Sequence, residues 1–473
     1  MHLAEAHDGD GAWMRYLHRE FFPDDDFRNF VDRLLHGLGP GDELDLVFGG
    51  DLFEFEGPRV VDREIQFDDR PRTEDNALET LDRIVADHPT FFRAIGAVVD
   101  AGHRVVFVVG NHDAQLGFPR VEQRLRQHVA RFVTKVPVER LAARVRVRPW
   151  FFQTADGVHV EHGHQYDTWC AFRDPLRPLG PQGREIHPTV GSEAFRHLIS
   201  RMGFFNAYDE RTFMLSGPRY LAHWARHYLF SKHSLAATWA VGALRVFGTM
   251  LAARPPRELA AVIRREAAAA RARFAERHTL EWARLERHAA LFAQPADDQP
   301  HRVVRELRLD RLALGALAVA GLLVSAVKPK LGLAVSASAV LLGMVHELVG
   351  PTVGFDAEYV RVDQVARKIA AIYRARAVIF GHTHIPGCEI EDGVLFANTG
   401  AWAPDAPSAD VDEAPPPRKT GRPIVWLRRP ADDRGAPIEG GLYRFGEGEL
   451  EAQVEATTRE RTSMFGELRP TVV

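Results

Sequence analysis

Short apolar runs alternate with amphipathic stretches through the first third of the chain. Leu44 to Phe48 and Arg104 to Val109 are rich in Val, Leu or Phe, as buried strands are. Residues 27–38, 76–85 and 91–99 place apolar side chains three and four positions apart, which predicts a helix in each range. Strands alternating with helices predict a layered α/β domain.

The same pattern continues later in the chain. Residues 144–153 and 157–161 read as two strands of a hairpin whose turn contains Ala155, Asp156 and Gly157. After Val360 we predict a helix over 364–373 and a strand over 377–380. A hairpin turning at Asp392-Gly393 and strands over 423–428 and 441–445 follow. The two α/β blocks should therefore build one sheet-containing domain.

Residues 172–359 between those blocks predict a helical insertion. Three early prolines, at 175, 178 and 181, interrupt regular structure, and long segments rich in Ala, Arg and Leu follow. Ser234 is a candidate cap for a helix running to Phe247. Residues 257–291 interleave Arg and Glu with Ala and Leu, which predicts one helix with a solvated face.

Two uncharged apolar runs inside the insertion, 312–327 and 331–345, flank Lys328-Pro329-Lys330 and predict a helical hairpin. At ~1.5 Å per residue each run reaches roughly 24 Å, less than the ~30 Å hydrocarbon core of a bilayer. Two interpretations stay open at this point. The hairpin contacts a membrane, as the arginines at 305, 308 and 311 favour, or it is a buried core hairpin rich in Ala and Gly.

Composition narrows the classes of partner and compartment. Among 473 residues, 60 Lys and Arg face 64 Asp and Glu, and this net charge of -4 does not favour a nucleic-acid binder. Two cysteines, Cys170 and Cys388, are too few for a disulfide framework, so we expect a reducing, cytoplasmic compartment, with membrane association through 312–345. Residues 1–11 lack the apolar segment of a signal peptide, and the acidic, Pro-rich segment 406–422 is typical of a loop.

Candidate chemistry sits directly after three predicted strands. Asp51 follows Gly49-Gly50, and Asn111, His112 and Asp113 follow Gly110. His382 and His384 follow the strand that ends at Phe380. Polar residues at such strand ends meet at one edge of an open sheet, where α/β proteins bind ligands.

The donor types indicate a metal centre. His162-Gly163-His164 ends the predicted hairpin, and we expect one of these two histidines to bind metal and the other to lie outside the ligand set. Carboxylate and amide oxygens together with several imidazoles suit divalent Mn, Fe or Zn. One carboxylate can bridge two such ions ~3.5–4 Å apart, an arrangement that activates a shared water and binds a phosphoryl oxygen.

The order Gly50-Asp51, Gly110-Asn111-His112-Asp113, His162 and Gly381-His382-Thr383-His384 resembles the calcineurin-like metallophosphoesterase superfamily. The likeness covers roughly residues 1–164 and 360–402. It implies a two-sheet α/β sandwich flanked by helices, here with a large α-helical insertion. The expected divisions are 1–171 and 360–473 for the two parts of the metallophosphoesterase domain and 172–359 for the insertion.

The resemblance also implies a role for each site residue. Asp51 bridges two ions, one held by His2 and His384 and the other by Asn111, His162 and His382. His112 contacts the phosphoryl group or protonates the leaving oxygen. Asp113, which stands where many members have Glu, orients the His112 ring by accepting a hydrogen bond.

The chain opens with Met1-His2-Leu3, whereas the family opens with a strand that ends in Asp-x-His. The first strand and its Asp are therefore absent from this sequence, and we expect translation to start upstream, with Met1 as the middle residue of an Asp-Met-His motif. The resemblance implies hydrolysis of a phosphomonoester, phosphodiester or pyrophosphate, in a small molecule or a lipid-linked substrate. The alternative is a catalytically silent, membrane-attached interaction protein with a vestigial metal site.

Overall fold

The computed structural model describes residues 24–57, 59–61, 64–66, 70–198, 235–349, 355–402, 421–429, 438–446 and 449–452. The strands are β1 Asp45–Phe48, β2 Arg59–Val61, β3 Glu64–Gln66, β4 Arg104–Val108, β5 Val145–Arg148, β6 Phe151–Gln153, β7 Val158–Glu161, β8 Ala377–Phe380, β9 Gly387–Glu391, β10 Val394–Asn398, β11 Arg422–Arg428, β12 Glu439–Gly446 and β13 Glu449–Ala452. The longer helices are α2 Asp24–Gly37, α3 Glu74–Asp87, α4 Pro89–Asp100, α5 Pro119–Ala130, α6 Val138–Arg144, α7 Val190–His197, α9 Leu235–Ala253, α10 Arg257–Arg277, α11 Trp282–Ala289, α12 Pro300–Glu306, α13 Leu309–Ser325, α14 Pro329–Val349 and α15 Phe355–Tyr373. Short 3-10 turns are η2 Ala114–Gly117, η3 His164–Tyr166 and η6 Ala296–Asp298.

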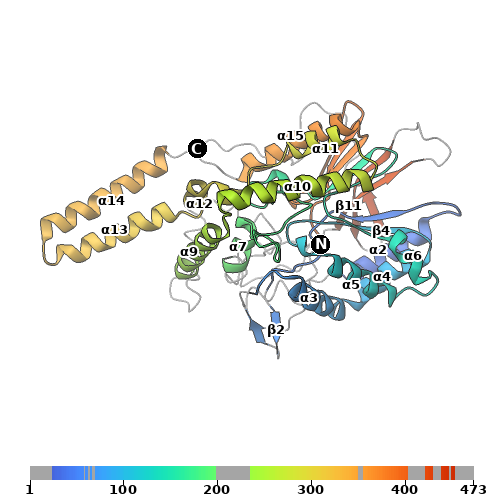
Figure 1. Cartoon of the computed structure of the whole chain (residues 1–473), viewed down its shortest axis with the longest axis horizontal. Coiled ribbons are helices and arrows are strands. Elements are labelled where there is room, and N and C mark those ends of the chain that lie inside the picture. Colours follow the sequence, from blue (N-terminus) through green and yellow to red (C-terminus); the bar gives the residue numbers. More distant parts are fainter. Residues whose placement is uncertain are drawn as a thin grey trace.

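The predicted mixed α/β fold is confirmed. A parallel sheet has the order β1-β4-β5, and a mixed sheet has the order β6-β7-β8-β10-β9. An antiparallel sheet of β11, β12 and β13 and the hairpin of β2 and β3 complete the described strands. Figure 1 shows α2 to α6 gathered on the side of the parallel sheet, with α10, α11 and α15 on the opposite side.

Alternation of side chains along β4 explains how the layers pack. Val105 and Phe107 join the core shared with α2 to α5, whereas Val106 and Val108 face the mixed sheet and contact Ile379 of β8. Because successive strand residues point to opposite faces, a strand covered on both sides must be apolar throughout. The two sheets therefore pack face to face, with a layer of helices outside each.

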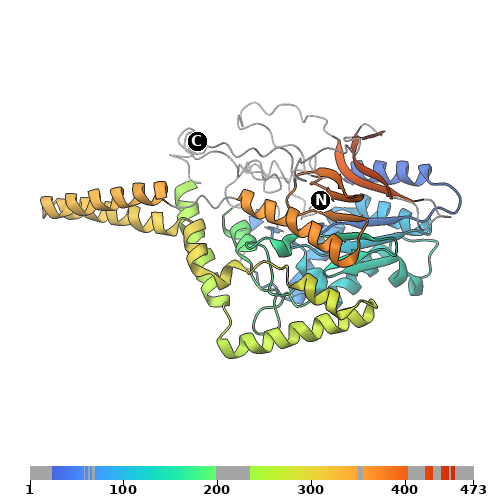
Figure 2. The same cartoon turned by 90° about the horizontal axis from the view of Figure 1, so that it is seen from above.

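The outer face of the mixed sheet is covered by α15 and by a helix from the predicted insertion, α11. Val378 and Phe380 of β8 pack with Val365 of α15 and Leu285 of α11. The insertion is thus attached to the sheet by a shared apolar core. Its far end, α13 and α14, forms a hairpin that projects away from the rest of the molecule (Figures 1 and 2).

Two predicted elements are each interrupted. The strand predicted over 144–153 is wrong as one element, because β5 pairs with β4 in one sheet and β6 pairs with β7 in the other. The helix predicted over 257–291 divides into α10 and α11 at Thr279, whose φ is 53°. There the amide of Leu280 donates to the carbonyl of Ala275 and closes the first helix.

Several predictions fall on parts of the chain outside the described residues. These are His2, the expected N-terminal motif, Ser234, and the acidic segment 406–422 apart from its last two residues, of which Arg422 opens β11. Over the described ranges, every helix is too short or too polar to cross a bilayer.

Candidate metal centre

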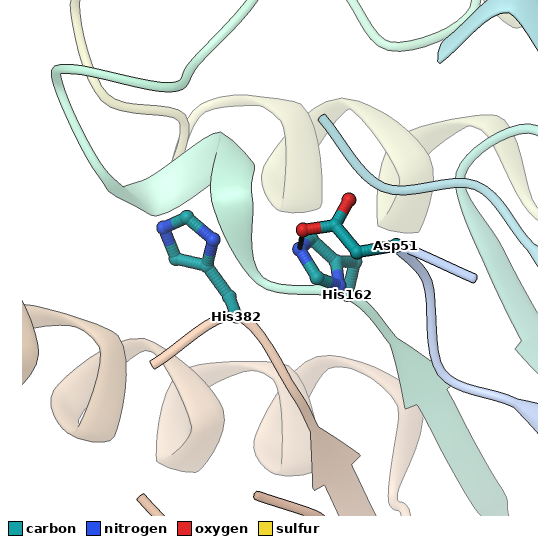
Figure 3. A group of neighbouring side chains, drawn as sticks. All are labelled: Asp51, His162 and His382. Carbon is teal, nitrogen blue, oxygen red and sulfur yellow. Dashed lines mark ion pairs between the residues drawn. The ribbon is translucent and has the colours of Figure 1, made fainter. Parts of the chain in front are cut away.

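Four strand ends deliver the candidate ligands to one place. Asp51 follows β1, Asn111 follows β4, His162 directly follows β7, and His382 comes two residues after β8. Asp51, His162 and His382 each offer a ligand atom, and these atoms lie within 4.8 Å of one another (Figure 3). Asp51 and His162 are buried, which removes competing water from this end of the sheets.

Two glycines make this close approach possible. Gly50 has a φ of +94°, and a Cβ there would overlap the His162 ring. A Cβ on Gly110 would overlap the carboxylate of Asp51. Each glycine therefore leaves the space in which a ligand side chain stands.

The imidazole of His162 meets acceptor oxygens at both of its ring nitrogens. Its Nδ1 lies 2.9 Å from the carbonyl oxygen of Gly49, which can only accept, so Nδ1 carries a proton. Nε2 then faces Oδ2 of Asp51 at 2.9 Å and Oδ1 of Asn111 at 3.1 Å. Three acceptors around one point require a positive charge between them, either a second ring proton or a cation. A divalent metal fits this donor set.

His382 lies beside His162, with ring centroids 5.2 Å apart. Its Nε2 lies 2.9 Å from a carboxylate oxygen of Asp167, which ends the short turn η3. Asp167, Cys170 and His382 form a second group that could hold a metal ion. The centre thus extends from Asp51 past His382 toward Asp167.

His112 is fixed by carboxylates at two points. Its backbone amide donates to Oδ1 of Asp51 at 2.8 Å, and its Nδ1 forms an ion pair with Oε2 of Glu54 at 2.6 Å. Burial lowers the pKa of His112, but the charges of Glu54 and Asp51 outweigh that effect and raise it to about 10. The ring also packs edge-on against Phe195, with centroids 5.1 Å apart.

The expected role of Asp113 is wrong. Its oxygens accept backbone hydrogen bonds from Gly110 at 2.6 Å and from Leu52 at 2.8 Å, and Glu54 pairs with the His112 ring instead. Asp113 thus hydrogen-bonds within the loop that follows β4 and links it to the loop that follows β1. Asp113 is therefore a positioning residue for the loop that carries Asp51.

His384 and His164 are the remaining candidate ligands within the described residues. His384 lies two residues after His382 on the same loop, and both have left-handed backbones, with φ of 58° and 65°. His164 is buried with its ring 5.4 Å from that of His162, and burial together with the neighbouring His162 charge lowers its pKa well below the usual value. His164 thus favours the neutral form.

Sequence reasoning missed Glu54 and Asp167 as partners of the site. Glu54 stands three residues after Asp51, in the same Gly-Gly-Asp-Leu-Phe-Glu stretch, so its proximity was visible in the sequence. Asp167 follows the His162-Gly163-His164 motif by only three residues, and no pattern distinguished it from a turn carboxylate.

Comparisons with models of known protein families, with curated proteins and with solved structures return no match. Only the residues of this chain therefore bear on its function.

Proposed function

We propose that this chain is a metal-dependent phosphoesterase acting on a phosphomonoester, phosphodiester or pyrophosphate bond. The observation that carries the proposal is the cluster of acceptors from separate strand ends around Nε2 of His162. Face-to-face sheets with outer helices, and motifs at the strand ends, are what a calcineurin-like metallophosphoesterase sandwich requires. A divalent metal would satisfy these acceptors, as a second proton on the His162 ring would in its absence.

The proposed ligand set divides between two divalent ions, which would be Mn, Fe or Zn. Asp51 would bridge them, Asn111, His162 and His382 would hold one, and His384 would contribute to the other, together with His2. Bound in pairs, such ions lower the pKa of water and bind phosphoryl oxygens. Asp167 accepts a hydrogen bond from His382 and would orient its ring, as outer carboxylates do for metal-bound histidines.

His112 is the proposed catalytic residue that is not a metal ligand. Glu54 holds its Nδ1, and the side chain remains 16% exposed beside the buried ligands. A positioned imidazolium can hold a phosphoryl oxygen or protonate the leaving oxygen. Glu54 would therefore orient the His112 ring, which is the role expected for Asp113.

The test is Mn²⁺-dependent hydrolysis of an aryl phosphate and an aryl phosphodiester by the full chain and by its His112→Ala variant. General acid catalysis contributes roughly 10²- to 10⁴-fold, so the variant should lose turnover on that scale while its Mn²⁺ content stays unchanged. His36→Ala, an exposed histidine on α2, is the matched control and should keep full activity. Equal turnover of His112→Ala and the parent chain would remove His112 from the mechanism.

The second candidate is a catalytically silent interaction protein attached to a membrane, and the hairpin of α13 and α14 favours the attachment. Small residues face each other inside the hairpin: a Cβ on Gly321 would overlap Ser336 and Gly332. Ser336 also donates a hydrogen bond across the pair to the carbonyl of Ala318, at 2.7 Å. Large apolar side chains point outward instead, among them Leu317, Val319, Leu322, Leu323, Val327, Leu331, Leu341, Leu342 and Met344.

Helix pairs in lipid pack closely through small residues and turn Leu and Val toward the lipid. They do so because moving an apolar side chain from lipid to a helix interface gains no hydrophobic free energy. Exposed lysines at 328 and 330 end the hairpin and suit anionic headgroups. We therefore propose that the hairpin enters an anionic lipid surface without crossing it. A lipid-linked phosphate becomes the preferred substrate class if both proposals hold.

Cosedimentation with phosphatidylserine-containing vesicles tests this attachment. Leu323→Asp with Val327→Asp, at positions 73% and 82% exposed, should abolish vesicle binding, because each puts a charge on the inserted face. Val138→Asp, at a position 70% exposed on α6, is the matched control and should bind as the parent does. Two outcomes would contradict insertion of the hairpin: loss of vesicle binding by the Val138→Asp control alone, or unchanged binding by both the control and the double variant. Vesicle binding without turnover across metals would favour the silent protein.

A further inference from the structure

A second cluster of metal-ligand side chains lies on the outer face of β7, behind the candidate metal centre. His159 and Glu161 are two apart on the strand and so point to the same side, toward α11 and α15. His288 of α11 faces them. All three are buried, with exposed fractions of 0% for each histidine and 2% for Glu161.

Two of the three residues, His159 and Glu161, make no side-chain hydrogen bond. Neither carboxylate oxygen of Glu161 and neither ring nitrogen of His159 has a hydrogen-bond partner. A buried carboxylate without a partner is strongly unfavourable, so a positive species must stand near it. The Trp150 ring packs against His288 and the Phe151 ring against His159, which shields the cluster from bulk water.

The spacing favours a shared cation over ion pairs. Nε2 of His288 lies 3.4 Å and Nε2 of His159 lies 3.6 Å from the same oxygen, Oε2 of Glu161. An imidazolium–carboxylate hydrogen bond would be about 2.7–2.9 Å long. Two ligands on a tetrahedral zinc, each about 2.0–2.1 Å from the metal, stand about 3.3–3.4 Å apart. The three ligand atoms lie within 4.8 Å of one another, as one coordination sphere requires.

Neighbouring tyrosines complete the arrangement. The Tyr373 hydroxyl lies 3.1 Å from Nδ1 of His288, and the Tyr166 hydroxyl lies 2.7 Å from Nε2. One tautomer satisfies both contacts: Nδ1 donates to Tyr373, and Nε2 accepts from Tyr166. A bound cation would take the Nε2 lone pair in place of the Tyr166 proton, with that hydroxyl beside it as the fourth donor.

We infer that His159, Glu161 and His288 bind a structural zinc ion that joins α11 of the inserted helices to β7. Two imidazoles and a carboxylate are zinc ligands, and the Tyr166 hydroxyl would close the fourth position of a tetrahedral site. The ion would be separate from the proposed catalytic pair. It would also anchor the residue directly before His162, so the helical layer and the candidate metal centre would be held by the same strand.

Zinc content distinguishes this site from the catalytic one when the comparison is made in an Asp51→Asn background. After loading with Zn²⁺ and dialysis against a weak chelator, Asp51→Asn should retain about one more zinc per chain than Asp51→Asn/His288→Gln, by elemental analysis. Added Zn²⁺ should raise the melting temperature of the first protein more than that of the second, because the ion binds the folded chain. Equal zinc content and equal shifts would overturn the proposal.

A second measurement covers the case in which His288→Gln does not fold. Co²⁺ bound to Asp51→Asn should show the intense visible absorption of a four-coordinate ion, and Asp51→Asn/Glu161→Gln should lose it. Retention of the full spectrum in the Glu161→Gln protein would also overturn the proposal. Neither measurement depends on turnover, so a failure of the phosphoesterase assignment would leave both interpretable.

Discussion

A buried network beside His112 offers a sharp test of how this fold is stabilised. Nε of Arg72 lies 3.0 Å and 3.1 Å from the two oxygens of Glu56, and its NH2 donates to Glu193. The Arg72 side chain is only 9% exposed. Arg72→Met keeps much of the apolar stem and removes the charge shared by the two acids. Breaking a buried pair in this way costs about 3–5 kcal/mol, because the partner charge stays buried.

Other contacts reduce that cost. Arg196 still reaches Glu56 at 2.6 Å, and His197 lies 3.3 Å from Glu193. We therefore expect a loss of about 3 kcal/mol in the free energy of unfolding for Arg72→Met. Adding Glu193→Gln removes one of the two buried carboxylates that Arg72→Met deprives of a positive partner. The double variant should therefore lose less unfolding free energy than the sum of the two single losses, by about 1 kcal/mol or more.

The pH dependence of stability gives an independent check on Glu193. Burial raises its pKa, but the hydrogen bond from His197 and the charges of Arg72 and Arg196 outweigh burial and lower it to about 2. A carboxylate whose pKa is lowered on folding stabilises the protein above its unfolded pKa of about 4.5. That contribution, about 3 kcal/mol, is lost as the pH falls from about 4.5 toward 2.

Urea unfolding, followed by tryptophan fluorescence and far-ultraviolet circular dichroism, measures both effects. Glu193→Gln should show a shallower loss of stability below pH 4.5 than the parent chain. The reasoning would be refuted by a loss below about 1 kcal/mol for Arg72→Met together with strict additivity in the double variant. Because Phe195 packs against His112 between Glu193 and Arg196, Arg72→Met should also lower turnover at neutral pH.

Two further changes probe the candidate metal centre. Glu54→Gln should lower metal-dependent turnover at least about 10-fold without loss of bound Mn²⁺, since Glu54 positions His112 and is not a ligand; unchanged turnover would contradict this role. Gly110→Ala should lose both Mn²⁺ and thermal stability, because the new Cβ overlaps the Asp51 carboxylate, whereas Gly117→Ala, with open space around its Cβ position, should lose neither. Calorimetric titration with Mn²⁺ and a melting curve distinguish the two alanine variants, and equal behaviour would refute the packing argument.

The layered core was predictable because each strand carries its own burial pattern. The run at Val105 to Val108 is apolar at every position, and only a strand covered on both faces needs that. The break between β5 and β6 has a sequence signal in Pro149, which has no amide hydrogen for a strand ladder, but the change of sheet depends on tertiary pairing. Local periodicity does not say which sheet a strand joins.

The candidate ligands were predictable from their places at strand ends, but their supporting contacts were not. The family resemblance implied that Asp113 orients the ring of His112, its neighbour in the sequence. The backbone amides of Gly110 and Leu52 attract its carboxylate more directly, and Glu54 reaches the ring from another loop. Such choices depend on loop geometry, which the spacing of residues does not encode.

The left-handed backbones of Asp51, His382 and His384 make the candidate centre visible to a selection that never measures activity. A non-glycine residue in this conformation costs about 1–2 kcal/mol relative to glycine. A library of variants sorted only for thermal stability in the presence of a chelator should therefore become enriched in glycine at His382 and His384, and less so at Asp51, which accepts the His112 amide. The same library sorted with Mn²⁺ present should retain the original residues. Positions that reverse their preference between the two selections would outline the metal centre at single-residue resolution, with no knowledge of the substrate.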